Sequence, residues 1–206
     1  MSANINEVII KRYNRVAKIY DYMDKMIRIE WRRDLLDLAS KEVLEVGVGT
    51  GINLPLYPKG ISSLTGVDFS SEMLNIAKQK AGSINQSHPT MFLEADIQDL
   101  PFEDHTFDTV VSTCVFCSVP DPIKGLKEIR RVCKPDGQIL MLEHMRSENK
   151  IIGAIMDLLN PLPVKLWGAN INRDTMNNIE AAGLSVISEK YLMGTIMRKL
   201  VLTPKK

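Results

Sequence analysis

Three glycines near position 50 stand at a spacing that suits a ligand site. They follow a short apolar run, because residues 43–51 read Val-Leu-Glu-Val-Gly-Val-Gly-Thr-Gly. Glycines at the end of a strand let the backbone turn sharply and let a ligand approach the main chain closely. The dinucleotide fingerprint G-x-G-x-x-G does not fit, since Ile52 follows Gly51. A phosphate-binding P-loop is also excluded, because no Gly-Lys-Ser/Thr sequence follows.

Two aspartates follow these glycines, each after a predicted strand. Asp68 ends the run 64–68, and Asp96 comes shortly after the run 91–94. A carboxylate at the first position can accept hydrogen bonds from both hydroxyls of a ribose. Asp96 can accept one from an adenine amino group, with Ile97 and Met73 on the faces of the ring. Because ligands of open α/β sheets bind outside the carboxyl ends of the strands, the pattern predicts an adenosine site there.

Alternating strands and helices must position these residues. Helices are predicted from Ser70, over 123–132 and over 174–182, and the second ends at the stop signal 134–137. Strands separated by helices predict an α/β fold with a mostly parallel sheet. The tail contains a hairpin joined at Met193-Gly194, so one of its strands runs antiparallel. The predicted strands are 43–46, 64–68, 91–94, 107–113, 138–143, 184–192 and 195–203.

Composition resembles that of soluble globular proteins. The chain has 206 residues, 45% hydrophobic and 25% charged, with a formal net charge of +1, which excludes a disordered chain and a nucleic-acid binder that works through bulk charge. Three cysteines are too few for a disulfide framework and no signal segment is found, so we expect a cytoplasmic protein. Residues 1–40 carry +2, 41–149 carry −5 and 150–206 carry +4. The basic residues of the two flanks are either distributed over a solvated surface without a function, or they contact an anionic surface such as the inner surface of the membrane.

Residues from about 40 to 143 resemble a class I S-adenosylmethionine-dependent methyltransferase. The likeness rests on Glu45 and the glycines in a first motif, on Asp68 in a second and on Asp96 in a third. It implies a Rossmann-like seven-stranded sheet, mostly parallel with an antiparallel last strand and with helices on both faces. It also implies S-adenosyl-L-methionine as the cofactor. By this resemblance Glu45 and the glycine loop lie near the methionine part of the cofactor. Thr113, beyond the fourth strand, also lies near the cofactor.

The residue pattern and the resemblance together give a predicted cofactor site. Its members are Tyr20, Glu45, Gly47, Val48, Gly49, Thr50, Gly51, Asn53, Asp68, Phe69, Met73, Asp96, Ile97 and Thr113. Tyr13 and Tyr20, seven residues apart on a helix predicted over 6–38, lie over the cofactor or form a core stripe. We expect one domain over 1–206, with an N-terminal helical cap (1–40), a cofactor-binding core (41–144), and a lid segment followed by a helix and hairpin (145–206).

The sequence narrows the methyl acceptor to small or lipophilic molecules. After the fourth strand the chain lacks the Asn/Asp-Pro-Pro-Tyr/Phe motif of adenine-N6 and glutamine methyltransferases. Residues 13–21 resemble the start of quinone C-methyltransferases and of bacterial phosphatidylethanolamine N-methyltransferases, and 46–57 are similar to the phospholipid group. Residues 114–119 and 142–144 look more like methyltransferases of alkyl thiols. A phospholipid amine, a quinol and an alkyl thiol all stay open, as do a nicotinamide-dependent reductase and a non-catalytic cofactor-binding protein.

Two side-chain features after the fourth strand have a functional and a plain interpretation. His144, with Glu143 behind it, is the candidate general base for an acceptor that must lose a proton, or it caps a loop. Cys114 and Cys117 have C-x-x-C spacing without further zinc ligands, so we predict no metal site and favour ordinary packing.

The segment 150–167 is unusually apolar for a connection. We expect it to pack in the core, and the alternative is a lid or a membrane-touching helix flanked by Lys150 and Lys165. Together with the basic flanks, that alternative would give peripheral membrane contact. The expected partner is a small-molecule or lipid-like methyl acceptor and not a nucleic acid, and the oligomeric state stays open.

Overall fold

The computed structural model describes residues 27–205 except residue 86. Most of the helix predicted over 6–38, including Tyr13 and Tyr20, lies outside the described residues. Its described end is helix α2 (Ile29–Leu36), which packs Leu35 and Leu36 into the core. The other described helices are α3 (Ser71–Ser83), α4 (Pro122–Val132), α5 (Lys150–Leu159), α6 (Pro161–Trp167), α7 (Thr175–Ala181) and the 3₁₀ helix η1 (Leu54–Leu56).

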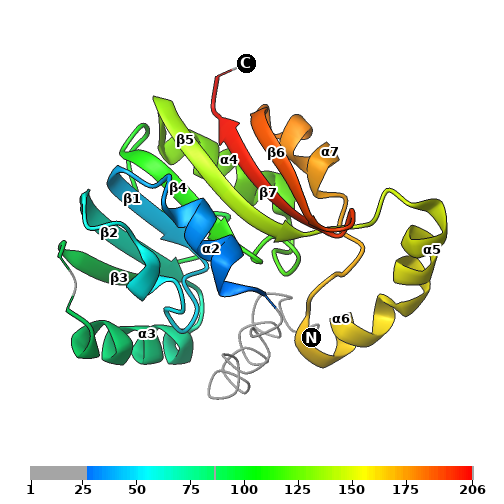
Figure 1. The fold of residues 1–206 in the computed structure, drawn as a ribbon, viewed down its shortest axis with the longest axis horizontal. Coiled ribbons are helices and arrows are strands. Elements are labelled where there is room, and N and C mark those ends of the chain that lie inside the picture. The colour runs from blue at the N-terminus through cyan, green and yellow to red at the C-terminus, as the bar shows by residue number, and fades with distance from the viewer. Residues whose placement is uncertain (1–26, 86, 206) are drawn as a thin grey trace, which may run out of the picture.

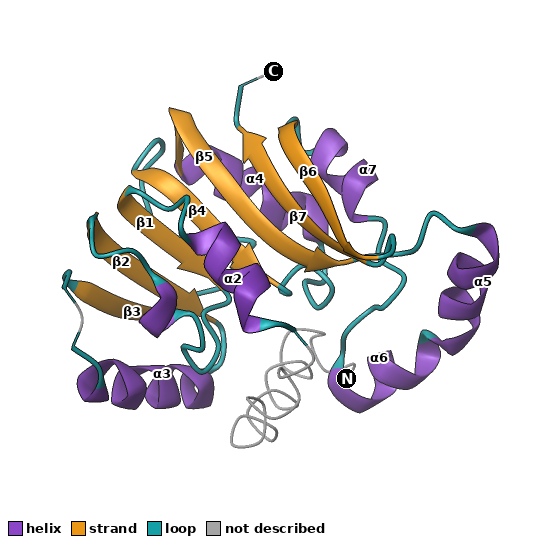
Figure 2. Cartoon of the chain, viewed as in Figure 1, coloured by secondary structure: helices purple, strands orange, loops and turns teal. Residues whose placement is uncertain are grey.

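A single seven-stranded sheet organises these helices (Figures 1 and 2). Its strand order is β3-β2-β1-β4-β5-β7-β6. Only β7 runs antiparallel to both of its neighbours, which confirms the predicted mostly parallel sheet with an antiparallel last strand. The strands are β1 (Lys41–Val46), β2 (Ile61–Asp68), β3 (Thr90–Glu94), β4 (Phe107–Thr113), β5 (Cys133–His144), β6 (Ser185–Met193) and β7 (Met197–Thr203).

Local side-chain chemistry explains where the helices begin. The Ser70 hydroxyl accepts a hydrogen bond from the amide of Met73, and the Asp121 carboxylate accepts one from the amide of Lys124. Such caps satisfy the first free amides of a helix, and Pro122 fits the first turn because it has no amide to satisfy. The predicted helices from Ser70 and over 123–132 therefore appear within one residue of their predicted starts.

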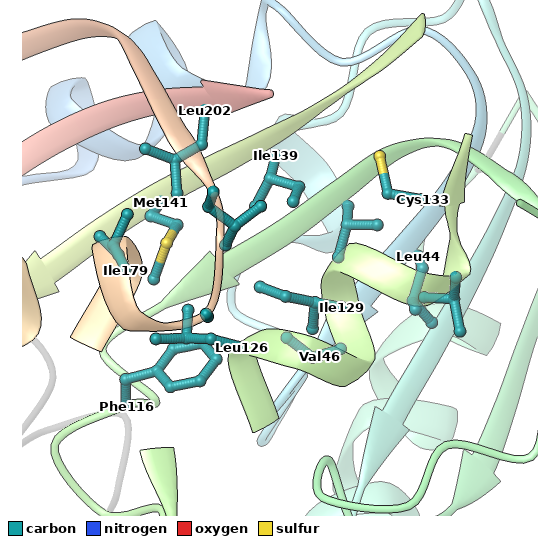
Figure 3. Close-up of a cluster of buried hydrophobic side chains, with 14 of the residues drawn as sticks. Leu44, Val46, Phe116, Leu126, Ile129, Cys133, Ile139, Met141, Ile179 and Leu202 are labelled. Carbon is teal, nitrogen blue, oxygen red and sulfur yellow. The ribbon is translucent and has the colours of Figure 1, made fainter. Parts of the chain in front are cut away.

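Strands β4 and β5 are covered by side chains on both faces of the sheet. This packing holds the central strands, and therefore their carboxyl ends, in place. Ile139 and Met141 face a cluster that includes Leu126 of α4 and Ile179 of α7 (Figure 3). The alternate residues of β5, Leu140 and Leu142, face a second cluster with the core side of α2. Side chains alternate along a strand, so the continuous apolar runs follow from burial on both faces.

Two details differ from the sequence predictions. Strand β5 begins at Cys133, and the predicted stop signal over 134–137 forms an irregularity, because Phe107 pairs with Cys133 whereas Thr109 pairs with Gln138. The predicted Met193-Gly194 turn is a longer loop, since Met193 pairs with Met197. Neither change alters the strand order.

The prediction that segment 150–167 packs in the core is wrong. It forms α5 and α6, whose large aliphatic side chains are mostly exposed, with Ile151 at 73% and Leu158 at 78%. Sequence apolarity reports only how hydrophobic a helix is, and not which side of it meets the protein. No helix among the described residues has both the length and the apolarity to cross a membrane.

Candidate active site

A cavity of about 340 Å³ opens at the carboxyl ends of the central strands. Its size falls in the range of small-molecule sites. Ten of the predicted site residues line it, namely Gly47, Val48, Gly49, Thr50, Asp68, Phe69, Met73, Asp96, Ile97 and Thr113. Glu45, Gly51 and Asn53 do not line it, and Tyr20 lies outside the described residues.

The three glycines have different tasks although all have positive φ angles. A Cβ added at Gly47 would come within 2.4 Å of Val115, and one at Gly51 within 2.6 Å of Leu54, so both positions are closed by packing. At Gly49 the nearest atom to an added Cβ would be the carbonyl oxygen of Gly47, 4.0 Å away. Gly49, with a φ of +55°, therefore presents bare backbone to the cavity.

Asp68 ties this glycine loop to the end of β2. Its Oδ2 accepts a hydrogen bond of 2.9 Å from the amide of Gly49, and its Oδ1 accepts one of 2.9 Å from the amide of Ser70. Burial raises the pKa of Asp68 to about 6, although the amides of Ser70 and Gly49 oppose the rise. A carboxylate offers about four lone-pair sites, so Asp68 can hold the loop and still accept a hydrogen bond from a ligand.

Asp96 lies beyond the end of β3, at the outer end of the cavity. The side-chain amide of Gln98 donates to both of its carboxylate oxygens at 3.0 Å. Gln98 in turn accepts a hydrogen bond from the amide of Asp121 at the start of α4. The carboxylate is therefore held in place beside Ile97 and Met73, which line the same cavity and offer flat apolar contact to a ring.

Arg32 of α2 is a site residue that the sequence interpretation missed. It is buried and lines the cavity, and its Nη1 donates hydrogen bonds of 3.0 Å to Asn53 Oδ1 and Thr113 Oγ1. One signal could have revealed it, because Arg32 lies three and four residues before Leu35 and Leu36, on the face of the helix that those leucines bury.

Glu45 and Asn53 form the support of Arg32. Asn53 donates to Glu45 Oε1 at 2.7 Å, and the hydroxyl of Tyr57 donates to Glu45 Oε2 at 2.9 Å. Burial raises the pKa of Glu45 to about 7, while the hydrogen bonds from Asn53 and Tyr57 and the charge of Arg32 lower it. These residues fix the guanidinium without touching the cavity themselves.

The charges of the cavity lie at opposite ends. Among the described residues that line it, Arg32 is the only basic one, whereas Asp68, Glu94 and Asp96 are acidic. Asp96 follows β3 and Thr113 ends β4, three strands further along the sheet, which corresponds to roughly 14 Å. The acidic part repels a pyrophosphate and suits hydroxyl groups, amino groups or a positive charge, whereas the far end suits a carboxylate.

The wall next to β4 contains a third buried acid, after Asp68 and Glu45. Glu143 accepts hydrogen bonds from the hydroxyl of Ser112 at 2.7 Å and from the amides of Val115 and Phe116. Burial raises its pKa to about 7, and those hydrogen bonds oppose the rise. Cys114, which has a φ of +57°, and Val115 line the cavity, so Glu143 holds that wall from behind.

His144 ends β5 and does not line the cavity. Burial lowers its pKa, which favours the neutral imidazole. The other two histidines, His88 and His105, also lie in the described part of the chain and away from the cavity. The catalytic role of His144 stays a prediction.

The cysteines and acids form no metal centre in the described part of the chain. Burial raises the pKa of Cys117 to about 11, so that thiol is a poor nucleophile and metal ligand at neutral pH. Cys133 is also buried, and Cys114 is partly exposed.

Comparison with known proteins adds to this geometry. The sequence profile of a family described as "Methyltransferase domain" matches residues 44–141. A phosphatidylethanolamine N-methyltransferase of Cereibacter sphaeroides is 34% identical over 152 residues, which cover 72% of this chain and 74% of that protein.

A more distant relative and a solved structure agree with that match. A ubiquinone/menaquinone biosynthesis C-methyltransferase of Geotalea daltonii is 30% identical over 66% of this chain, and the match spans 63% of the relative's length. The crystal structure of a methyltransferase from Aquifex aeolicus superposes with a TM-score of 0.69 at 21% identity, covering 92% of this chain and 97% of that one. At that identity the structural likeness shows the fold alone.

Proposed function

The chain belongs to the class I S-adenosylmethionine-dependent methyltransferases, and we propose that it methylates a small, lipophilic acceptor above the ends of β1 to β4. The observation that carries the proposal is the cavity itself. It combines a bare glycine turn, three acidic side chains at one end and a buried guanidinium at the other.

The side chains of the cavity fit the adenosine part of the cofactor. Asp68 would accept from the ribose hydroxyls, and Asp96 would accept from the adenine amino group, with Ile97 and Met73 against the ring. Gly49 is open toward the cavity, so the main chain can approach the ligand there. The acidic surroundings also favour a positively charged ligand over a dinucleotide.

Arg32 would hold the opposite end of the cofactor. An amino-acid carboxylate needs a cation where it is removed from water, and a guanidinium matches its two oxygens. Arg32 is the only basic side chain among the described cavity residues, and it lies beside Thr113, which the family resemblance had placed near the cofactor. Glu45 and Asn53 would then act through Arg32, by holding it in place.

The remaining residues would align the acceptor and exclude water. When bound, the cofactor supplies an electrophilic methyl group on a positively charged sulfur. Displacement at such a group gains most of its rate from alignment and from a dry site. Val115, Val119 and Pro120 also line the cavity and provide that apolar surface.

We place an amine first among the open acceptors. None of the three histidines lines the cavity, so a thiol or phenol would find no imidazole there to remove its proton. A primary amine is mostly an ammonium ion at neutral pH, but it reacts through its neutral form, which the acids of the cavity do not repel, whereas these acids disfavour a thiolate or a phenolate. The relative from Cereibacter sphaeroides, whose name states a phosphatidylethanolamine substrate, supports the same choice.

Two measurements test the proposal in sequence. Calorimetric titration with S-adenosylhomocysteine should give saturable binding, and its absence at millimolar ligand from folded protein would count against the cofactor site. Turnover of labelled S-adenosylmethionine is then compared across phosphatidylethanolamine vesicles, quinols, alkyl thiols and small amines. Faster turnover of a thiol or a quinol than of any amine would contradict the choice of acceptor.

A further inference from the structure

Helices α5 and α6 present an unusual apolar surface. Six aliphatic side chains, most of them three or four residues apart, are at least half exposed. They are Ile151, Ile155, Leu158, Leu159, Leu162 and Leu166, and we call them the aliphatic face. Soluble proteins rarely expose so many neighbouring aliphatic side chains without a partner. Figure 1 shows both helices set apart from the sheet.

The opposite side of α5 is fixed against the protein, so the aliphatic face cannot simply turn inward. Met156 is buried, and a Cβ added at Gly153 would come within 2.9 Å of the guanidinium of Arg146. Arg146 also forms an ion pair of 2.8 Å with Asp157. The helix is therefore held by Gly153, Met156 and Asp157, and the aliphatic face points away.

These helices are connected to the wall of the cavity. Asn160, between α5 and α6, donates to the side chain of Asn170 at 3.2 Å. The amide of Asn170 and the guanidinium of Arg173 both donate to the carbonyl oxygen of Cys117. Arg173 also donates to the carbonyl oxygen of Val119, which lines the cavity. A surface bound by α5 and α6 would thus be linked to one wall of the cavity by hydrogen bonds.

Charge around the aliphatic face is positive. Lys150 and Lys165 are exposed at its two ends, while the one acid of these helices, Asp157, is paired with Arg146. Residues 150–206 as a whole carry a net charge of +4. Lysines around an apolar face are the arrangement by which interfacial helices bind anionic lipids.

We propose that the aliphatic face docks on an anionic lipid surface, with α5 and α6 lying along it. Lipid fits better than a second copy of this chain, because all six residues are Ile or Leu, whereas protein interfaces are enriched in aromatic residues, Met and Arg. The inference deepens the proposed lipophilic acceptor, since such molecules reside in that surface. Vesicle binding is measured without turnover, so this inference and the proposed activity can fail separately.

The test uses the full chain and vesicles of phosphatidylcholine, with and without phosphatidylglycerol, at low and high salt. One variant combines Ile151→Ser with Leu158→Ser. A matched control combines Met91→Ser with Ile187→Ser, which change two comparably exposed apolar residues (55% and 64%) on strands β3 and β6. S-adenosylhomocysteine binding is measured for each protein as a check that the core is folded.

Wild type and control should sediment with the phosphatidylglycerol vesicles at low salt. The α5 variant should partition onto them about tenfold more weakly or worse, with unchanged S-adenosylhomocysteine binding. Exchange of Lys150 and Lys165 for Gln should remove most of the salt dependence. Wild type that stays in solution, or an α5 variant that binds as well as the control, overturns the inference. A wild-type dimer that the α5 variant converts to a monomer, without vesicle binding, also overturns it and assigns the face to a second copy.

Discussion

The substitution Arg32→Gln tests whether Arg32 contacts the cofactor or only supports the structure of the cavity. Glutamine keeps an amide donor but removes the positive charge beside Thr113 and Asn53. If Arg32 holds the carboxylate of the cofactor, only ligands that carry this carboxylate should bind more weakly.

The expected loss follows from the type of bond. A hydrogen bond to a charged group contributes about 1.5–3 kcal/mol, which corresponds to a loss of roughly 10- to 100-fold in affinity. Arg32 is 2% exposed, so solvent screens the interaction little and the upper part of this range applies. Loss of its charge should also raise the pKa of Glu45 further, which keeps that buried acid neutral.

The assay is calorimetric titration with two ligands. S-adenosylhomocysteine has the amino-acid carboxylate, whereas 5′-methylthioadenosine lacks the whole amino-acid part. Arg32→Gln should weaken the first by about 10- to 100-fold and the second by less than about twofold. Arg33→Gln, on the exposed side of the same helix, is the matched control and should change neither.

Equal weakening of both ligands would refute the argument, because Arg32 would then only shape the cavity. So would unchanged affinity for S-adenosylhomocysteine. A thermal melt of each variant shows whether the bonds to Asn53 and Thr113 matter for folding alone.

Three further outcomes follow from the site. Asp68→Ala should weaken S-adenosylhomocysteine binding at least about tenfold, whereas Asp99→Ala, an exposed acid nearby, should leave it unchanged, and equal effects would contradict the ribose assignment. Because burial raises the pKa of Asp68 to about 6 and binding needs its ionised form, affinity should fall about tenfold from pH 7 to pH 5. Asp68→Asn should lose this dependence. His144→Ala should lower the turnover number less than about tenfold, because His144 does not line the cavity. A larger loss, together with the loss of the acidic limb of the pH–rate profile, would identify His144 as the general base.

The approximate positions of the strands along the chain follow from local sequence signals. The run 107–113 contains two consecutive valines, Val110 and Val111, because the centre of β4 is covered on both faces, and that pair shows in the sequence. The carboxyl ends of neighbouring parallel strands meet at one edge, so Asp68 and Asp96 could be assigned to one site before any coordinates. Those predictions need only strand periodicity and chain order.

The part of the site around Arg32 could not be predicted in this way. Arg32 comes from α2, and no spacing rule relates it to Thr113, 81 residues later. Glu45 was expected close to the cofactor, but it lies beneath the cavity and holds Asn53. Side chains from separate elements meet through tertiary packing, which a single sequence does not specify.

The same limit explains segment 150–167. Its composition fits a buried helix and an interfacial helix equally well, because both need many aliphatic residues. Only the contacts of Gly153 and Met156 show which side meets the protein.

The uneven charge along the chain has a spatial counterpart that joins the two proposals. The acids of the cavity follow β2 and β3, whereas basic residues of the tail lie on β6, β7 and the helices α5 and α6. Five strand spacings separate β3 from β7, or roughly 24 Å, which is about three Debye lengths at physiological salt. The acids of the cavity and the basic hairpin are therefore largely screened from each other, so the acids can attract a cationic cofactor without cancelling the positive charge of the hairpin. Added salt should therefore release the protein from vesicles while leaving its affinity for S-adenosylhomocysteine nearly unchanged. If both kinds of binding weaken together, the two sites are not electrostatically independent.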